Sequence, residues 1–181
     1  MALRLRPWRT AVGICKSSPA QRVRAVAGQE QADLLGTMYV GTIHGFCFQM
    51  LSRYNSHFES YDVLDPNRVA AFLQRVNFTL DLKRFDPDGK LFKGMRHFQD
   101  SVDVVENELL DVDALPEQFK SALLSYYELL ENHKLMTFGQ QIGNMVRLLE
   151  DEEMRARVAA DIDHLIVDEY QDVNPAQERL I

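Results

Sequence analysis

The stretch HLIVDEYQDVNPAQ, residues 164–177, decides the fold class, because it joins an apolar run to two neighbouring carboxylates. The run Leu-Ile-Val at 165–167 does not alternate with polar residues. We therefore expect a strand over 164–168 that is buried on both faces, as strands inside parallel sheets are. Asp168 and Glu169 lie at the carboxyl end of that strand, which is where ligands collect in open α/β sheets.

The residues after the two carboxylates predict a turn and then a helix. Asn174 can cap the helix, Pro175 suits its first turn, and Gln177 stands three residues after the cap, the spacing of a capping box. At such a strand-to-helix turn, Asp168 can hold Mg²⁺ on the phosphates of a nucleotide. Glu169 can take a proton from an attacking water. Strand, acidic pair, turn and helix form a Walker B arrangement, a pattern that is common when it stands alone.

A second ordered segment, residues 38–54, reads as a short strand followed by a helix. Residues 38–40 favour a strand, and Thr42 is placed to cap the helix with its hydroxyl. The apolar positions after Thr42 recur at helical spacing and form one face: Ile43, Phe46, Cys47, Met50, Leu51 and Tyr54.

The residues between these two segments predict a mostly helical region. Helix starts are expected at Asn67, Ser101, Pro116 and Thr137. Pro87 and Gly89 predict a turn within 85–92, and a polar helix is expected near 151–160.

Charge is unevenly distributed along the chain. The 181 residues carry a net charge of −7, yet residues 1–28 hold six basic residues and no acidic one. Overall acidity argues against a protein that coats nucleic acid by charge alone, although it leaves room for a local DNA groove. We interpret residues 1–36 as a basic leader outside the folded domain, with an organelle transit peptide as the alternative.

Cysteine content and hydropathy bound the class of protein. Two cysteines, Cys15 and Cys47, make neither a disulfide framework nor a CxxC metal site, so a reducing, cytoplasmic setting is expected. The sequence contains no apolar run near the roughly 20 residues that span a bilayer, which argues against an integral membrane protein. Nothing in the sequence indicates an oligomeric state.

IVDEYQDVNPAQ, ending at Gln177, closely resembles motif II of the UvrD/Rep/PcrA-like superfamily 1 DNA helicases. GTIHGFCFQML, residues 41–51, is similar to the TxH motif of the same family, and the two motifs occur in the family's order. The resemblance implies an α/β fold, a partial RecA-like P-loop NTPase domain interrupted by a mostly helical inserted subdomain. The RecA-like part would comprise 37–54 and 136–181, the insertion would comprise 55–135, and residues 1–36 would remain unassigned.

The resemblance also implies a function and a set of site residues. The family consists of ATP-dependent DNA helicases that translocate 3′-to-5′ and separate strands. Its cofactors are ATP and Mg²⁺, and its partners are single-stranded and double-stranded DNA. By resemblance, Asp168 would coordinate Mg²⁺ and Glu169 would act as the general base. Gln171 and Asp172 would connect the nucleotide site to the DNA-binding surface. By the same resemblance, Thr42 and His44 would lie near the DNA backbone.

Each assignment has a simpler alternative. Asp168 and Glu169 could be capping charges at a helix start, and His44 could be a surface or hydrogen-bonded histidine. His44 and Cys47 share a helix face, but two ligands without partners do not make a zinc site. Aromatic residues at helical spacing are more often core than base-stacking platforms. A non-enzymatic helical protein-interaction module derived from the insertion is the alternative function.

The sequence also departs from the family. It contains no GxxxxGKS/T phosphate loop, whose backbone N–H groups and lysine would hold ATP. The family's Asp-Phe pair before the final strand is replaced by Thr137-Phe138. We therefore expect the N-terminal ATP-binding region of a helicase without its Walker A loop, an incomplete fragment that is inactive by itself.

Overall fold

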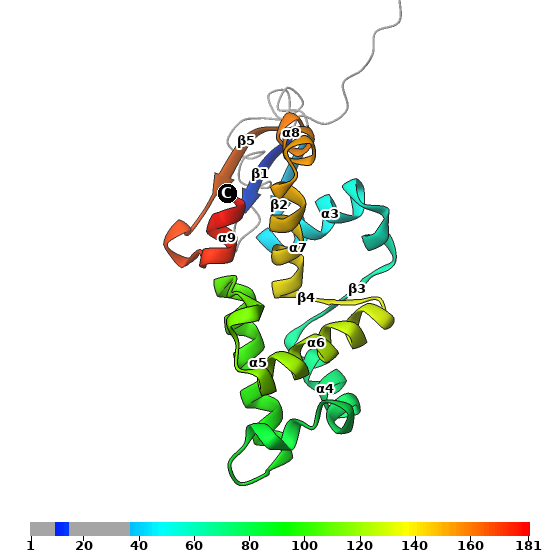
Figure 1. The fold of residues 1–181 in the computed structure, drawn as a ribbon. Helices are drawn as coiled ribbons and strands as arrows, with labels where there is room; N and C mark the ends of the chain where they lie inside the picture. The colour runs from blue at the N-terminus through cyan, green and yellow to red at the C-terminus, as the bar shows by residue number, and fades with distance from the viewer. Residues whose placement is uncertain (1–9, 15–36) are drawn as a thin grey trace, which may run out of the picture.

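Two clusters of buried hydrophobic side chains divide the structure. The computed structural model describes residues 10–14 and 37–181, whose arrangement is shown in Figure 1. Most of the described residues are helical, and the strands are few and short. The strands are β1 (Thr10–Ile14), β2 (Thr37–Gly41), β3 (Asp62–Leu64), β4 (Leu135–Thr137) and β5 (Ile162–Val167). The α-helices are α3 (Ile43–Tyr54), α4 (Pro66–Leu80), α5 (Leu91–Glu108), α6 (Glu117–Asn132), α7 (Phe138–Glu150), α8 (Glu152–Ala160) and α9 (Pro175–Leu180). The short 3₁₀ helices are η1 (Ser56–Ser60), η2 (Leu82–Phe85), η3 (Val112–Ala114) and η4 (Tyr170–Asp172).

A three-stranded parallel sheet has the order β2-β1-β5. Its central strand falls inside the expected basic leader, so that interpretation is wrong for residues 10–14; the rest of 1–36 lies outside the described residues. In the pairing register, Ile14 at the end of β1 lies opposite both Gly41 of β2 and Val167 of β5. All three strands therefore end at the same edge of the sheet.

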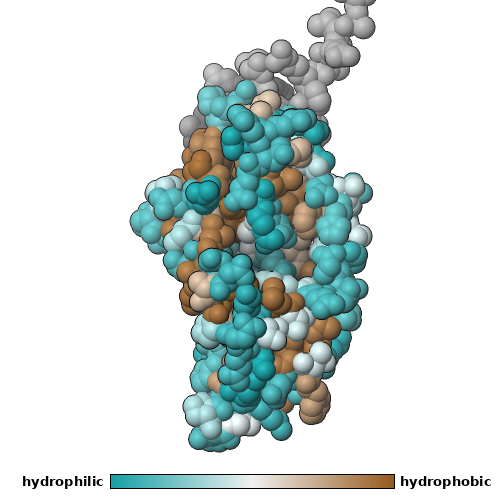
Figure 2. All heavy atoms as spheres, in the orientation of Figure 1, coloured by the Kyte–Doolittle hydropathy of each residue, from teal (hydrophilic) through white to brown (hydrophobic). Residues whose placement is uncertain are grey.

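Strand β5 is less buried than its apolar sequence predicts. It begins two residues earlier than expected and ends at Val167, so Asp168 follows the strand. Leu165 is 38% exposed and Ile166 is 63% exposed, which contradicts the expectation of burial on both faces. The physical reason is that β5 pairs with β1 along one edge, and no other described strand pairs with its second edge. On the face seen in Figure 2, hydrophobic residues gather over the part of the molecule that carries β5 and α9.

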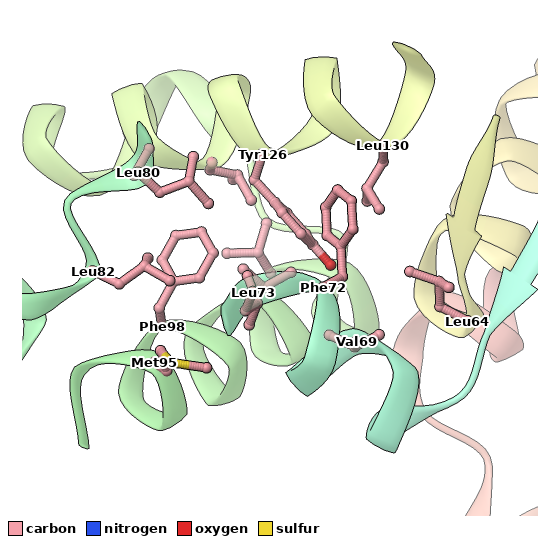
Figure 3. Close-up of a cluster of buried hydrophobic side chains, with 14 residues drawn as sticks. Leu64, Val69, Phe72, Leu73, Leu80, Leu82, Met95, Phe98, Tyr126 and Leu130 are labelled. Atoms are coloured by element: carbon pink, nitrogen blue, oxygen red, sulfur yellow. The ribbon is translucent and has the colours of Figure 1, made fainter. Parts of the chain in front are cut away.

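The helical unit is built from α4, α5 and α6 around one hydrophobic cluster (Figure 3). Phe98 and Tyr126 meet edge-to-face in this cluster, with ring centroids 5.7 Å apart. The helix-start predictions were partly wrong here. Helix α4 is capped by Asp65, with Pro66 in its first turn, and not by Asn67. Ser101 lies inside α5, where its hydroxyl donates to the carbonyl of His97.

The second cluster joins α3, α7, α8 and α9. The helices of this cluster begin where the sequence predicts. Thr42 caps α3 through a hydrogen bond from the backbone N–H of Gly45 (3.1 Å). Thr137 and Gln140 form a capping box at the start of α7. The expected polar helix near 151–160 is α8.

Strands β3 and β4 run side by side as a parallel two-stranded ribbon between the two clusters. They are also the two places where the chain passes between the sheet-bearing part and the helical unit (Figure 1). Within the described residues, no helix is both long and apolar enough to cross a membrane.

Candidate functional site

The sheet register brings the two predicted motifs to one edge. Thr42 directly follows β2 and Asp168 directly follows β5, and both strands end opposite the same residue of β1. Neighbouring strands lie about 4.8 Å apart, so the two chain segments leave the sheet roughly 10 Å from each other. The predicted nucleotide-binding and DNA-binding residues therefore lie at one end of one sheet.

The residues after β5 form a short, exposed turn, which we call the carboxylate turn (residues 168–173). The Oδ1 atom of Asp168 accepts a hydrogen bond from the backbone N–H of Glu169 at 3.0 Å. The backbone N–H of Asp172 donates to the carbonyl of Glu169 at 2.9 Å, and that of Val173 donates to the carbonyl of Tyr170 at 3.1 Å. These bonds close one 3₁₀ turn directly after the strand.

Glu169 has an unusual backbone conformation. Its φ and ψ angles are 55° and 42°, in the left-handed region, which costs a non-glycine residue about 1–2 kcal/mol. Its side chain is held by a hydrogen bond from the amide of Gln171. Strained backbone of this kind is common where a side chain must be held at a site, so the conformation is consistent with a functional role for Glu169.

Helix α9 fixes the far end of the carboxylate turn. Asn174 Oδ1 accepts from the backbone N–H of Gln177 at 2.9 Å, and Gln177 Oε1 accepts from the backbone N–H of Asn174 at 3.2 Å. This is the capping box that the sequence predicts, with Pro175 in the first turn.

His44 is a half-buried residue and not a fully exposed one. Its ring lies against Phe138, with centroids 5.1 Å apart, and burial lowers its pKa from the usual value of 6.5. The histidine is therefore neutral near pH 7, and the structure places it between the start of α3 and the start of α7. Any DNA contact at this position would come from a neutral imidazole.

For the aromatic residues and for Cys47, the structure favours a role in core packing. Phe46 and Tyr126 are buried core residues, as expected for aromatics at helical spacing. Cys47 is fully buried, and burial raises its pKa to about 12, so its thiol stays protonated. Across residues 10–14 and 37–181, no three histidine, cysteine, aspartate or glutamate side chains are grouped as a metal site.

The donor set at the carboxylate turn fits Mg²⁺ that arrives with a nucleotide. Asp168 presents an exposed carboxylate, and oxygen is the donor that Mg²⁺ prefers. Mg²⁺ in nucleotide sites needs only one or two protein carboxylates, because substrate phosphates and water complete the shell. A permanently bound structural metal would need more protein ligands than this turn supplies.

The sequence analysis missed one buried acid, Glu106, at the junction between the two clusters. Its carboxylate accepts a hydrogen bond from the Thr137 hydroxyl at 2.9 Å. Burial, reinforced by the charge of Asp103, raises the pKa of Glu106 to about 7. A signal was present, because Glu106 lies four residues after Val102 on the apolar stripe of α5. A charged residue at such a position indicates a buried polar contact.

This buried acid predicts a specific pH dependence of stability. The pKa of Glu106 rises from 4.5 to about 7 on folding, so its favourable contribution is complete below pH 4.5 and is lost as the pH rises through 7. The loss amounts to about 3 kcal/mol. We expect Glu106→Gln to remove this pH dependence of the free energy of unfolding. At pH 8 the variant should be more stable than the parent by about 2 kcal/mol.

Urea denaturation at pH 5 and pH 8 measures this effect, with Glu108→Gln as the matched control. Glu108 lies on the same helix but is exposed. If Glu106→Gln and Glu108→Gln show the same pH dependence, Glu106 is not the group responsible.

Comparison with known proteins agrees with the motif assignment. The family model described as the UvrD/REP helicase N-terminal domain matches residues 17–181. An ATP-dependent DNA helicase UvrD1 from Mycobacterium tuberculosis is 28% identical over 163 residues, covering 80% of this chain and 20% of the relative. An ATP-dependent DNA helicase PcrA from Bacillus subtilis is 26% identical over 182 residues, covering 89% of this chain and 22% of the relative.

The chain therefore spans about a fifth of the length of these relatives. The match covers the described structure from β2 to the end of α9, including the helical unit and the carboxylate turn, and leaves out only β1. On these grounds the chain belongs to the UvrD/REP helicase N-terminal domain family.

Proposed function

We propose that this chain supplies the Walker B half of the ATP site of a 3′-to-5′ DNA helicase, within a RecA-like domain interrupted by the helical unit. Under this proposal, residues 37–54 and 136–181 belong to the RecA-like domain, and residues 55–135 form the insertion. The partners are DNA and ATP with Mg²⁺.

One observation carries the proposal: the strand ends bring Thr42 and Asp168 to a single edge of a parallel sheet. Ligands bind at the carboxyl edge of such sheets. Under the proposal, this edge would combine a carboxylate pair for nucleotide chemistry, after β5, with residues for contact with DNA, after β2. A helical interaction module would not require this arrangement.

The proposed division of labour follows from the geometry of the carboxylate turn. Asp168, directly after the strand, holds the metal of MgATP. When bound, Mg²⁺ would neutralise charge on the β- and γ-phosphate oxygens. Glu169, oriented by Gln171, accepts the proton of the attacking water. Asp172 closes the turn through its backbone, so a shift of Gln171 or Asp172 would change the position of Glu169.

We further propose that the 181 residues do not hydrolyse ATP by themselves. Phosphoryl transfer depends on positioning and charge stabilisation, and an arginine finger alone contributes about 10³–10⁵ in rate. The sequence has no GxxxxGKS/T loop to fix the phosphates against Asp168 and Glu169. Activity is therefore tested in a joined protein, in which this chain is linked to the phosphate-loop segment and second motor domain of a UvrD-type relative.

The test of the proposal is the Mg²⁺ requirement of the joined protein after Asp168→Asn. The substitution keeps the shape but removes the charge that holds the metal. We expect at least a tenfold increase in the Mg²⁺ concentration needed for half-maximal ATP hydrolysis. Asp163→Asn, on β5 before the turn, is the control. An unchanged Mg²⁺ requirement in Asp168→Asn would show that this carboxylate is not the metal ligand.

A further inference from the structure

The last turn of α5 contacts the starts of two other helices. Glu106 accepts a hydrogen bond from Thr137 at the start of α7. The next residue, Asn107, accepts through Oδ1 a hydrogen bond from Nδ2 of Asn174, at 2.9 Å. Asn174 directly follows the carboxylate turn. The helical unit is thus hydrogen-bonded to the residue directly after the turn, across 67 positions of sequence.

The orientation of the Asn174 amide is determined by its capping role. Its Oδ1 atom accepts the backbone N–H of Gln177, and this leaves Nδ2 as the atom that points toward Asn107. Both asparagines are half-buried. Their hydrogen bond is therefore better protected from water than a hydrogen bond between two exposed side chains. One side chain therefore caps α9 and binds α5 at the same time.

Short-range backbone hydrogen bonds give the turn its shape, and the Tyr170 hydroxyl also donates to Glu178 of α9 at 3.5 Å. The hydrogen bonds at Glu169, Asp172 and Val173 each span at most three residues. These backbone bonds stay within the turn and do not reach the helical unit. The Asn107–Asn174 bond, next to the buried Glu106–Thr137 contact, does connect the residue after the turn to α5 of the helical unit.

We propose that Asn107 is a positioning residue, through which the helical unit fixes the carboxylate turn. A movement of the helical unit would pull on Asn174 and so change the geometry at Asp168 and Glu169. The consequence for ATP hydrolysis rests on the proposed function, whereas the attachment of the turn rests on the contacts alone.

The experiment is hydrogen exchange at single amides of the 181-residue chain, read by NMR. Asn107→Leu removes the acceptor at similar volume, and we expect the amides of Asp172 and Val173 to exchange three- to tenfold faster. Asn107→Asp keeps an acceptor for Asn174 and should preserve the parental rates. Glu108→Gln, exposed and one residue further along, is the matched control and should also leave them unchanged.

A second variant approaches the bond from the other side. Asn174→Ser keeps a cap on α9, since serine and asparagine are similar N-caps, but it removes the donor to Asn107. It should speed up hydrogen exchange at the same two amides. The double variant Asn107→Leu/Asn174→Ser should show no further increase in their exchange rates.

Two results would overturn the proposal. One is an exchange rate at Asp172 and Val173 in Asn107→Leu that stays within twofold of Glu108→Gln. The other is an equal increase in the exchange rates of these amides and of core amides such as that of Leu123, because an equal increase would indicate general destabilisation. Neither readout uses ATP or DNA, so an inactive joined protein would count against the proposed function and leave this result unaffected.

Discussion

In the joined protein, Glu169→Gln is expected to lower the turnover number for ATP about a thousandfold. A positioned general base contributes about 10²–10⁴ in rate, and the amide of glutamine cannot accept the proton of the attacking water. The substitution keeps the size and shape of the side chain, and its amide oxygen can still accept the hydrogen bond from Gln171. ATP affinity should therefore stay within a few fold of the parent.

Steady-state phosphate release and nucleotide-binding titrations separate the two quantities. Glu153→Gln is the control, because Glu153 is an exposed carboxylate on α8, away from the carboxylate turn. A Glu169→Gln turnover within tenfold of the parent would mean that another group acts as the base. Loss of ATP binding together with turnover would assign Glu169 to binding instead.

The second large effect is expected at Gly94, where α5 meets η2. A Cβ atom added to Gly94 would lie 2.1 Å from the backbone oxygen of Leu82, and backbone cannot move aside as a flexible side chain can. Gly94→Ala must separate α5 from η2 and loosen the packing around Leu82, which is fully buried. We expect a loss of about 3 kcal/mol in the free energy of unfolding.

Gly143 on α7 provides a matched helical control. A Cβ atom there would meet only Arg147, at an ordinary contact distance of 3.7 Å. Gly143→Ala should therefore gain about 0.5–1 kcal/mol from helix propensity. Urea denaturation of the two variants measures both values. Equal effects at the two glycines would refute the close approach of α5 and η2.

The parts of the fold that could be predicted from the sequence depend on local chemistry. Thr42, Thr137 and Asn174 cap helices because a hydroxyl or amide oxygen lies within reach of a free backbone N–H three residues later. The carboxylate turn follows from an apolar run that ends in two acids and a helix start. These signals need no knowledge of distant residues.

Two errors in the helix starts have local explanations. Asp65 caps α4 in preference to Asn67 because Pro66 suits the first helical position and leaves the preceding residue as the cap. Ser101 failed as a cap because α5 continues through it, from Leu91 to Glu108, with its hydroxyl bonded back to His97.

The remaining features depend on contacts that are distant in sequence. Strand β1 has no pattern of its own and is a strand because it pairs with β2 and β5. The exposure of Ile166 depends on which strands flank β5. The bond between Asn107 and Asn174 joins two residues whose separate contexts indicate only a helix end and a helix cap.

Under the proposed function, this chain carries the carboxylates of an ATP site but not the groups that hold the phosphates. The most direct test is phosphate release from the purified 181-residue chain with Mg²⁺, ATP and excess single-stranded DNA, beside its Glu169→Gln variant. We predict that the two proteins release phosphate at the same background rate, with or without DNA. DNA-stimulated turnover that disappears in Glu169→Gln would rule this out, because the chain would then contain a complete ATP site.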